Sequence, residues 1–99
     1  MGILNDKQFE FTRKVAILIL YAYELGYTIR LGDAYATHGH RMGSFHYKSL
    51  AIDLNLFKDG KYLTKTEDHK PLGEFWEKLG GTWGGRFRSA DGNHYSWGE

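Results

Sequence analysis

The chain has 99 residues, 41% of them hydrophobic, and this length predicts one domain, spanning residues 1–99, with a modest apolar core. The 13 Lys and Arg residues nearly balance the 12 Asp and Glu residues, and the net charge of +1 gives no electrostatic case for binding nucleic acid or an anionic membrane. The sequence contains no cysteine, which excludes a disulfide scaffold and a zinc finger built on thiolates.

The first predicted element is an amphipathic helix. Asn5 and Gln8 have the spacing of a helix N-cap and its capping-box partner. Beyond them, apolar residues recur at intervals of three and four, which is the spacing of one helix face. These residues are Phe11, Val15, Leu18, Ala22 and Leu25. Gly26 is the expected stop, because glycine readily adopts the left-handed conformation that ends many helices.

The same segment loosely imitates a signal peptide, since Arg13 and Lys14 precede an apolar run at 15–22. However, Asp6 and Glu10 stand where a signal peptide would be basic, and no small-residue cleavage site follows the run. The run is also far shorter than the roughly 20 residues that span a bilayer. We therefore expect no membrane insertion and a protein that is cytoplasmic as synthesised.

Strands are expected in the middle of the chain. Residues 27–31 alternate between polar and apolar as a strand does, whereas residues 34–45 lack any period and predict a loop. Residues 50–57 alternate again and place Asp53 on the face opposite Ile52 and Leu54. The pair Asp59-Gly60 then predicts a hairpin, whose second strand returns over residues 61–64.

A second helix begins near Pro71, which suits the first turn, and ends before Gly80. Its apolar residues are Leu72, Phe75, Trp76 and Leu79. Residues 82–87 are interrupted by glycines and predict a loop, and residues 94–97 predict a last strand. Two main helices with hairpin-joined strands indicate an α+β fold around a small, mostly antiparallel sheet.

Four residues have the side chains of a catalytic zinc site, which needs three protein ligands, an open position for water and a nearby base. His46 and Asp53 are seven positions apart, and Asp91 and His94 follow near the C-terminus in a turn-forming stretch. A carboxylate within an apolar strand is costly unless a cation or hydrogen bonds compensate its charge. Spacing alone leaves two alternatives open: a solvent-facing Asp53, and an ordinary turn beside a surface His94.

The motifs around these residues narrow the choice. Ser44, His46, Ala51 and Asp53 fit the pattern S-x-H-x-x-G-x-A-x-D, and Asp91 with His94 fits a later D-x-x-H. The chain thereby resembles a zinc peptidase family that includes D-Ala-D-Ala carboxypeptidases, vancomycin-resistance dipeptidases and phage L-alanyl-D-glutamate endopeptidases. The resemblance runs from about residue 27 to residue 97. The segments 83–85 and 91–95 look most like the phage endolysin branch.

This resemblance implies that His46, Asp53 and His94 bind Zn²⁺ and that Asp91 is the catalytic base. The sequence departs from the family pattern at Ser49, where relatives have glycine. Relatives also carry an arginine shortly after the first strand that helps polarise the scissile carbonyl, and none stands at 31–35 here. Arg41 is the preferred substitute, with Arg30 as the alternative.

The activity implied by the resemblance is that of a zinc metallopeptidase acting on peptidoglycan stem peptides. We expect an L-alanyl-D-glutamate endopeptidase that serves as a phage endolysin for host lysis, acting on the cell wall after release. The alternatives are a D-Ala-D-Ala carboxypeptidase and a non-catalytic wall-binding module of the same fold. The expected partner is the peptidoglycan peptide, bound by a monomer without a separate wall-binding domain.

Overall fold

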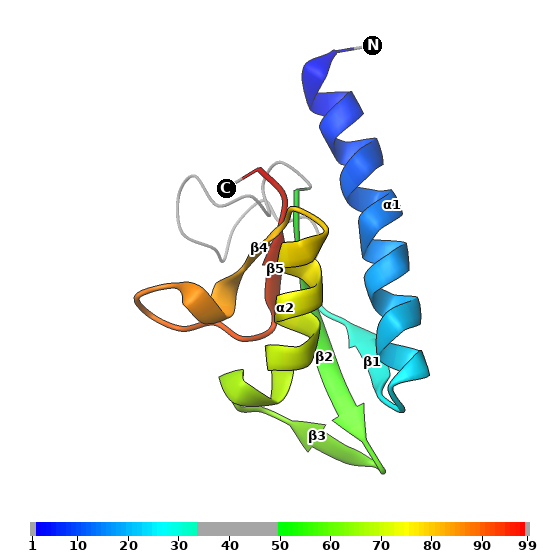
Figure 1. Ribbon diagram of the computed structural model, residues 1–99, viewed down its shortest axis with the longest axis vertical. Helices are drawn as coiled ribbons and strands as arrows, with labels where there is room; N and C mark the ends of the chain where they lie inside the picture. Colours follow the sequence, from blue (N-terminus) through cyan, green and yellow to red (C-terminus); the bar gives the residue numbers. More distant parts are fainter. Residues whose placement is uncertain (1, 34–49, 99) are drawn as a thin grey trace.

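The computed structural model describes residues 2–33 and 50–98, so the predicted loop at 34–45 and the candidates Arg41, Ser44 and His46 lie outside the described residues. The elements in chain order are α1 (Ile3–Glu24), β1 (Thr28–Leu31), β2 (Ala51–Lys58), β3 (Lys61–Leu63), the 3₁₀ turn η2 (Thr66–His69), α2 (Lys70–Lys78), β4 (Thr82–Trp83), the 3₁₀ turn η3 (Gly84–Arg86) and β5 (His94–Ser96) (Figure 1). The predicted α+β class is confirmed.

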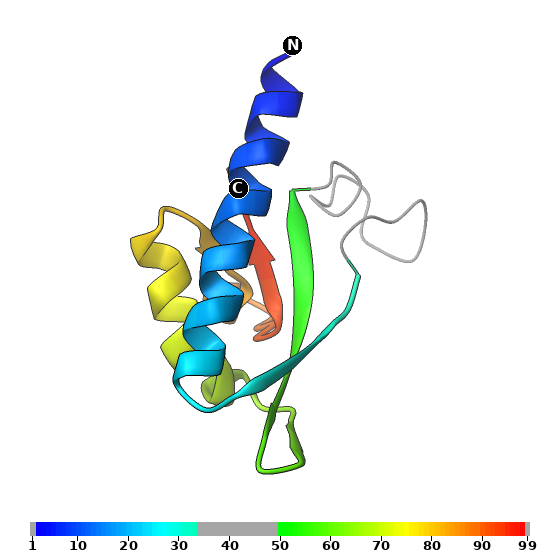
Figure 2. The same ribbon diagram turned by 90° about the vertical axis from the view of Figure 1, so that its right-hand side faces the viewer.

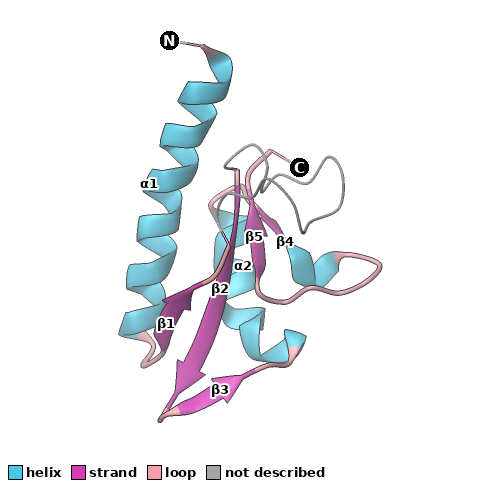
Figure 3. Cartoon of the chain, turned by 180° about the vertical axis from the view of Figure 1, so that it is seen from behind, coloured by secondary structure: helices cyan, strands magenta, loops and turns pink. Residues whose placement is uncertain are grey.

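The five strands form one antiparallel sheet built around β2. The strand order is β1-β2-β5-β4, and β3 pairs with β2 through the predicted hairpin (Figure 3). In that hairpin Asp59 and Gly60 both have positive φ, 52° and 78°, as a tight two-residue turn requires. The first residues of β2 pair with β5, and its later residues pair with β1 and β3. The register of β2 therefore determines how the other strands align.

Both α-helices lie on one side of the sheet (Figure 2). Their apolar residues pack against Ile52, Leu54 and Leu56, which form the inner face of β2. Burial in α1 follows the predicted stripe at four positions, Phe11, Val15, Leu18 and Ala22. The fifth position, Leu25, is 41% exposed because it lies at the C-cap, beyond the last helical residue.

The ends of α1 agree only in part with the sequence prediction. The predicted N-cap at Asn5 is wrong: the helix begins at Ile3, Gly2 occupies the N-cap, and no side chain caps the first turn. The stop at Gly26 is confirmed by its φ of 94°. The Gly26 and Tyr27 amides donate to the carbonyls of Tyr23 and Ala22, which closes the helix end as a glycine-terminated motif does.

Trp76 joins α2 to the two C-terminal strands from the centre of the core. Its side chain is fully buried, and its indole Nε1 donates to the carbonyls of Ser96 at 2.9 Å and Thr82 at 3.2 Å. The rings of Phe11 and Tyr95 meet it edge-on at 5.9 and 6.3 Å. One side chain thus ties both helices to β4 and β5.

The C-terminal third contains more regular structure than the sequence predicted. The expected loop at 82–87 contains β4 and η3, because Thr82 and Trp83 pair with Ser96 and Tyr95 of β5. A two-residue strand is too short to show an alternating pattern, so it left no signal. The turn η2 was also missed, and β3 and β5 each end one residue earlier than expected. Among the described residues, no helix is both long and apolar enough to cross a membrane.

Candidate metal centre

Asp53 and His94 are direct neighbours across the β2–β5 ladder. Directly opposed residues of an antiparallel pair point to the same face of the sheet, so both side chains lie on the face away from Leu54 and the helices. Asp53 is half-buried and His94 is buried, 5% exposed. The ring of Phe87 covers one side of the His94 imidazole, with a centroid separation of 5.1 Å. Both positions therefore sit on rigid, hydrogen-bonded backbone.

Asp91 reaches the same place from the turn that precedes β5. Its amide donates to the Gly84 carbonyl at 2.9 Å, and its own carbonyl accepts from the His94 amide at 3.2 Å. One side-chain ligand atom from each of Asp53, Asp91 and His94 lies within 4.8 Å of the others. The Asp91 side chain is exposed, whereas the other two are at least partly covered. The fold thus brings together three of the four residues predicted for the site.

Two glycines permit this close approach. Gly32 lies opposite Asp53, and its amide donates to the Asp53 carbonyl at 2.7 Å. A Cβ at Gly32 would stand 2.9 Å from the Asp53 Cβ, closer than side-chain carbons approach. A Cβ at Gly84 would stand 2.2 Å from the Asp91 carbonyl oxygen and 2.7 Å from the His94 Cβ. Glycine at these positions leaves room beside all three candidate side chains.

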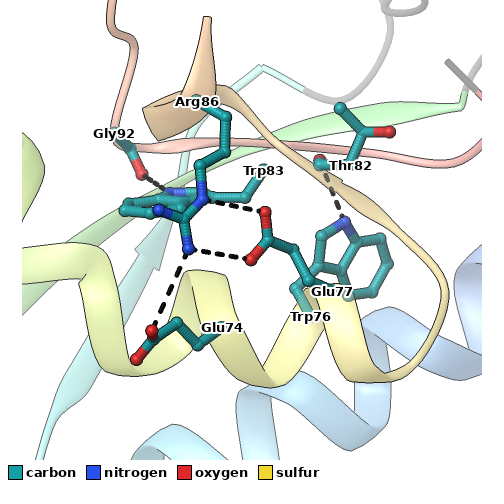
Figure 4. Close-up of polar contacts among 7 residues, drawn as sticks. All are labelled: Glu74, Trp76, Glu77, Thr82, Trp83, Arg86 and Gly92. Carbon is teal, nitrogen blue, oxygen red and sulfur yellow. Dashed lines mark hydrogen bonds and ion pairs between the residues drawn. The ribbon is translucent and has the colours of Figure 1, made fainter.

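Trp83 holds the turn that carries Asp91 at the neighbouring Gly92, and Arg86 lies beside the Trp83 ring (Figure 4). The buried Trp83 indole donates from Nε1 to the carbonyl of Gly92 at 2.8 Å. Arg86 lies over the Trp83 ring, with Cζ 5.2 Å from its centroid, and donates two 3.1 Å hydrogen bonds to the Glu77 carboxylate. Those bonds raise the pKa of Arg86, whose guanidinium is charged in any case. The chain beside the candidate site is therefore anchored to α2.

His69 is a neighbour of the site that the sequence did not reveal. It is 3% exposed, and its Nδ1 lies 2.8 Å from the hydroxyl of Tyr95, the residue after His94. Burial lowers the pKa of His69, although the carboxylates of Asp68 and Asp91 oppose that shift. Burial likewise raises the pKa of Tyr95, which keeps its proton. No spacing distinguished His69 from a surface histidine at a helix start.

The remaining candidates lie elsewhere. His46, proposed as the third metal ligand, and Arg41 are outside the described residues. Arg30 is exposed and stands opposite Asn55 on the same sheet face as Asp53. Its guanidinium extends toward Phe57, with Cζ 5.1 Å from that ring's centroid. Phe57 lies four positions beyond Asp53 along β2. Arg30 therefore points away from the group formed by Asp53, Asp91 and His94.

Comparison with known families decides the class of the protein. The family model described as D-alanyl-D-alanine carboxypeptidase matches residues 37–97, more than half of the chain and a range that holds both motifs. The chain belongs to this peptidase family. A comparison with curated proteins gave no match. The family resemblance is thereby confirmed, while the phage endolysin branch stays a prediction.

The anchoring of the Asp91 turn in this peptidase can be tested with Trp83→Phe, which keeps an aromatic ring and removes the donor to Gly92. Leaving a buried carbonyl without its hydrogen bond costs roughly 1–3 kcal/mol, so we expect a loss of that size in the free energy of unfolding. Amide exchange at His94 should also accelerate, because its acceptor belongs to the loosened turn. Trp97→Phe is the control, since the Trp97 indole donates no hydrogen bond among the described residues. Equal stability and exchange in the two variants would contradict this assignment.

Proposed function

We propose that this chain is a zinc-dependent peptidase that cleaves peptidoglycan stem peptides, of the L-alanyl-D-glutamate endopeptidase type. The observation that carries the proposal is the convergence of Asp53, Asp91 and His94 within 4.8 Å in a member of the D-alanyl-D-alanine carboxypeptidase family. The motif resemblance to phage endolysins supports the choice of bond and a role in host lysis. In this proposal the 99 residues act as one catalytic domain.

The donor set suits zinc. Imidazole nitrogen and carboxylate oxygen are both common zinc ligands, and catalytic sites combine three protein ligands with one position for water. We assign His46, Asp53 and His94 as the ligands, with His46 contributed by the segment outside the described residues. Asp53 and His94 come from adjacent hydrogen-bonded strands, and the space beside them is kept by Gly32 and Gly84. This rigidity favours a preorganised half-site for the metal.

Asp91 is assigned as the general base. When bound, zinc would polarise the substrate carbonyl and lower the pKa of a coordinated water to about 7. The Asp91 carboxylate accepts the proton of the attacking water and later returns it to the leaving amine. Its exposure on a turn keeps it accessible to both partners, and the Gly84 and Trp83 contacts limit its movement. Arg41 is proposed as the donor to the developing oxyanion, because Arg30 points away from the cluster.

Zinc content is the first test. Purified protein should bind about one zinc per chain, measured by elemental analysis, and a chelator should remove the metal together with activity. Ligands that bind only the folded state stabilise it, so chelation should lower the melting temperature by at least about 5 °C. Asp53→Asn is the matched variant, whose melting should not respond to zinc. A protein that stays fully active and melts unchanged after exhaustive chelation is not a zinc peptidase.

Separate roles for ligand and base give the second test. His94→Ala should lose zinc affinity, whereas Asp91→Asn should keep stoichiometric zinc and lower turnover by about 10²-fold or more, the usual contribution of a general base. Asp59→Asn makes the same substitution in the β2–β3 hairpin, where asparagine tolerates positive φ, and should be neutral. If Asp91→Asn loses zinc as completely as His94→Ala, Asp91 is a ligand and its assignment as base is wrong.

The family description itself favours a second candidate, a D-Ala-D-Ala carboxypeptidase. Mass spectrometry of the products formed from a pentapeptide stem separates the two. The endopeptidase should release a fragment with D-Glu at its amino terminus and leave the terminal D-Ala-D-Ala intact. Release of single D-Ala residues would instead identify a carboxypeptidase. Zinc binding without either product would leave the non-catalytic wall-binding module.

A further inference from the structure

A second group of side chains shares the sheet face of the candidate metal centre. Asp53, Asn55 and Phe57 occupy alternate positions of β2 and therefore point to the same side. Arg30 of β1 stands opposite Asn55, and Tyr62 of β3 stands opposite Phe57. We call Arg30, Asn55, Phe57 and Tyr62 the Arg30 cluster. It extends the face that begins with Asp53 and His94.

The two aromatic rings fix the position of the Arg30 charge. Phe57 and Tyr62 stack with centroids 4.9 Å apart and an interplanar angle of 22°. The Arg30 Cζ lies 5.1 Å from the Phe57 centroid and 5.8 Å from the Tyr62 centroid, a cation–π arrangement with both. Tyr62 is 50% exposed and Arg30 is exposed, so a ligand can reach the guanidinium.

The charge of Arg30 has no carboxylate partner within the described part of the chain. Arg86, the other arginine held over an aromatic ring there, is paired with Glu77 and Glu74. Among the described residues, the contacts of the Arg30 guanidinium are those with the two rings, which leave its N–H groups as donors. A fixed, solvent-accessible guanidinium of this kind favours a carboxylate ligand, which it can bind through two parallel hydrogen bonds.

Hydrogen bonds connect the Arg30 cluster to the candidate centre. The Asn55 Oδ1 accepts from the Tyr62 hydroxyl and from Asn93 Nδ2, both at 3.3 Å. Asn93 lies between Asp91 and His94 in the sequence, so the cluster and the metal-type residues form one continuous surface. Phe57 lies four residues from Asp53 along β2, about 14 Å at the strand rise of about 3.4 Å per residue.

We propose that the Arg30 cluster binds the C-terminal carboxylate of the peptide substrate, about three residues beyond the cleaved bond. This inference rests on the proposed peptidase function and deepens it. Three extended residues span roughly 10–11 Å, which is most of the separation of about 14 Å along β2. In a carboxypeptidase substrate, the carboxylate belongs to the residue directly after the cleaved bond, roughly 3.5 Å along, and cannot span that separation. The cluster therefore selects an endopeptidase substrate.

The test uses two synthetic stem peptides, L-Ala-γ-D-Glu-L-Lys-D-Ala with a free terminal carboxylate and the same peptide ending in a carboxamide. For the wild-type zinc enzyme we expect a KM about tenfold lower for the carboxylate peptide. Arg30→Gln should raise the KM of the carboxylate peptide to that of the carboxamide while kcat stays similar. Lys58→Gln is the control, since Lys58 also lies over a ring, that of Tyr27, but on the opposite face of β2. It should keep the preference.

A preference that survives in Arg30→Gln, or an equal loss of kcat/KM for both peptides, would overturn the proposal. Calorimetric binding of the same peptides makes the result independent of turnover. If wild type binds the carboxylate peptide about tenfold more tightly than Arg30→Gln does, the result supports carboxylate binding by the Arg30 cluster. Equal binding by the two proteins overturns it. Each result holds even if neither peptide is cleaved, in which case the peptidase proposal fails separately.

Discussion

The antiparallel pairing of β2 with β5 is the constraint on which the rest of the structure depends. It places Asp53 opposite His94, although the two residues are far apart in the sequence. Because side chains alternate along a strand, a slip of one residue would move Asp53 into the apolar layer among Leu54 and Leu56. Burying an unpaired carboxylate there costs several kcal/mol, so the same register that brings the polar pair together also protects the core.

The apolar side of the sheet reinforces that register. Tyr95 alternates with His94 on β5, is fully buried, and contacts both Trp76 and His69. Trp76 in turn donates to the carbonyls of Thr82 and Ser96, which stand opposite each other at one end of the β4–β5 pair. Each contact fixes β5 from the side opposite to Asp53 and His94. The backbone of the candidate site is therefore supported by packing on the opposite face of β5.

Much of this arrangement could be predicted from local patterns. The alternation at 50–57, the Asp59-Gly60 turn and the Pro71–Gly80 helix all correspond to observed elements, because each is stabilised by interactions within a short window. The sequence also predicted Asp53, Asp91 and His94 as site residues, since each belongs to one of two short motifs. It could not show β4, whose two residues become a strand only through pairing with β5. Nor could it show His69 or the Arg30 cluster, because both arise from contacts between elements distant in the chain.

Gly32 links the two ends of the proposed binding face. The ladder between β1 and β2 continues past Leu31 to Gly32 opposite Asp53, where only a glycine fits against the Asp53 backbone. That contact fixes the register of β1 against β2. Arg30, two positions before Gly32, therefore lies on the same sheet face as Asp53. A one-residue shift would turn Arg30 toward the helices and bring a larger side chain against Asp53. The pairing of β1 with β2 thus sets both the space beside Asp53 and the position of the Arg30 guanidinium. Any change in that pairing should disturb metal binding and carboxylate recognition together.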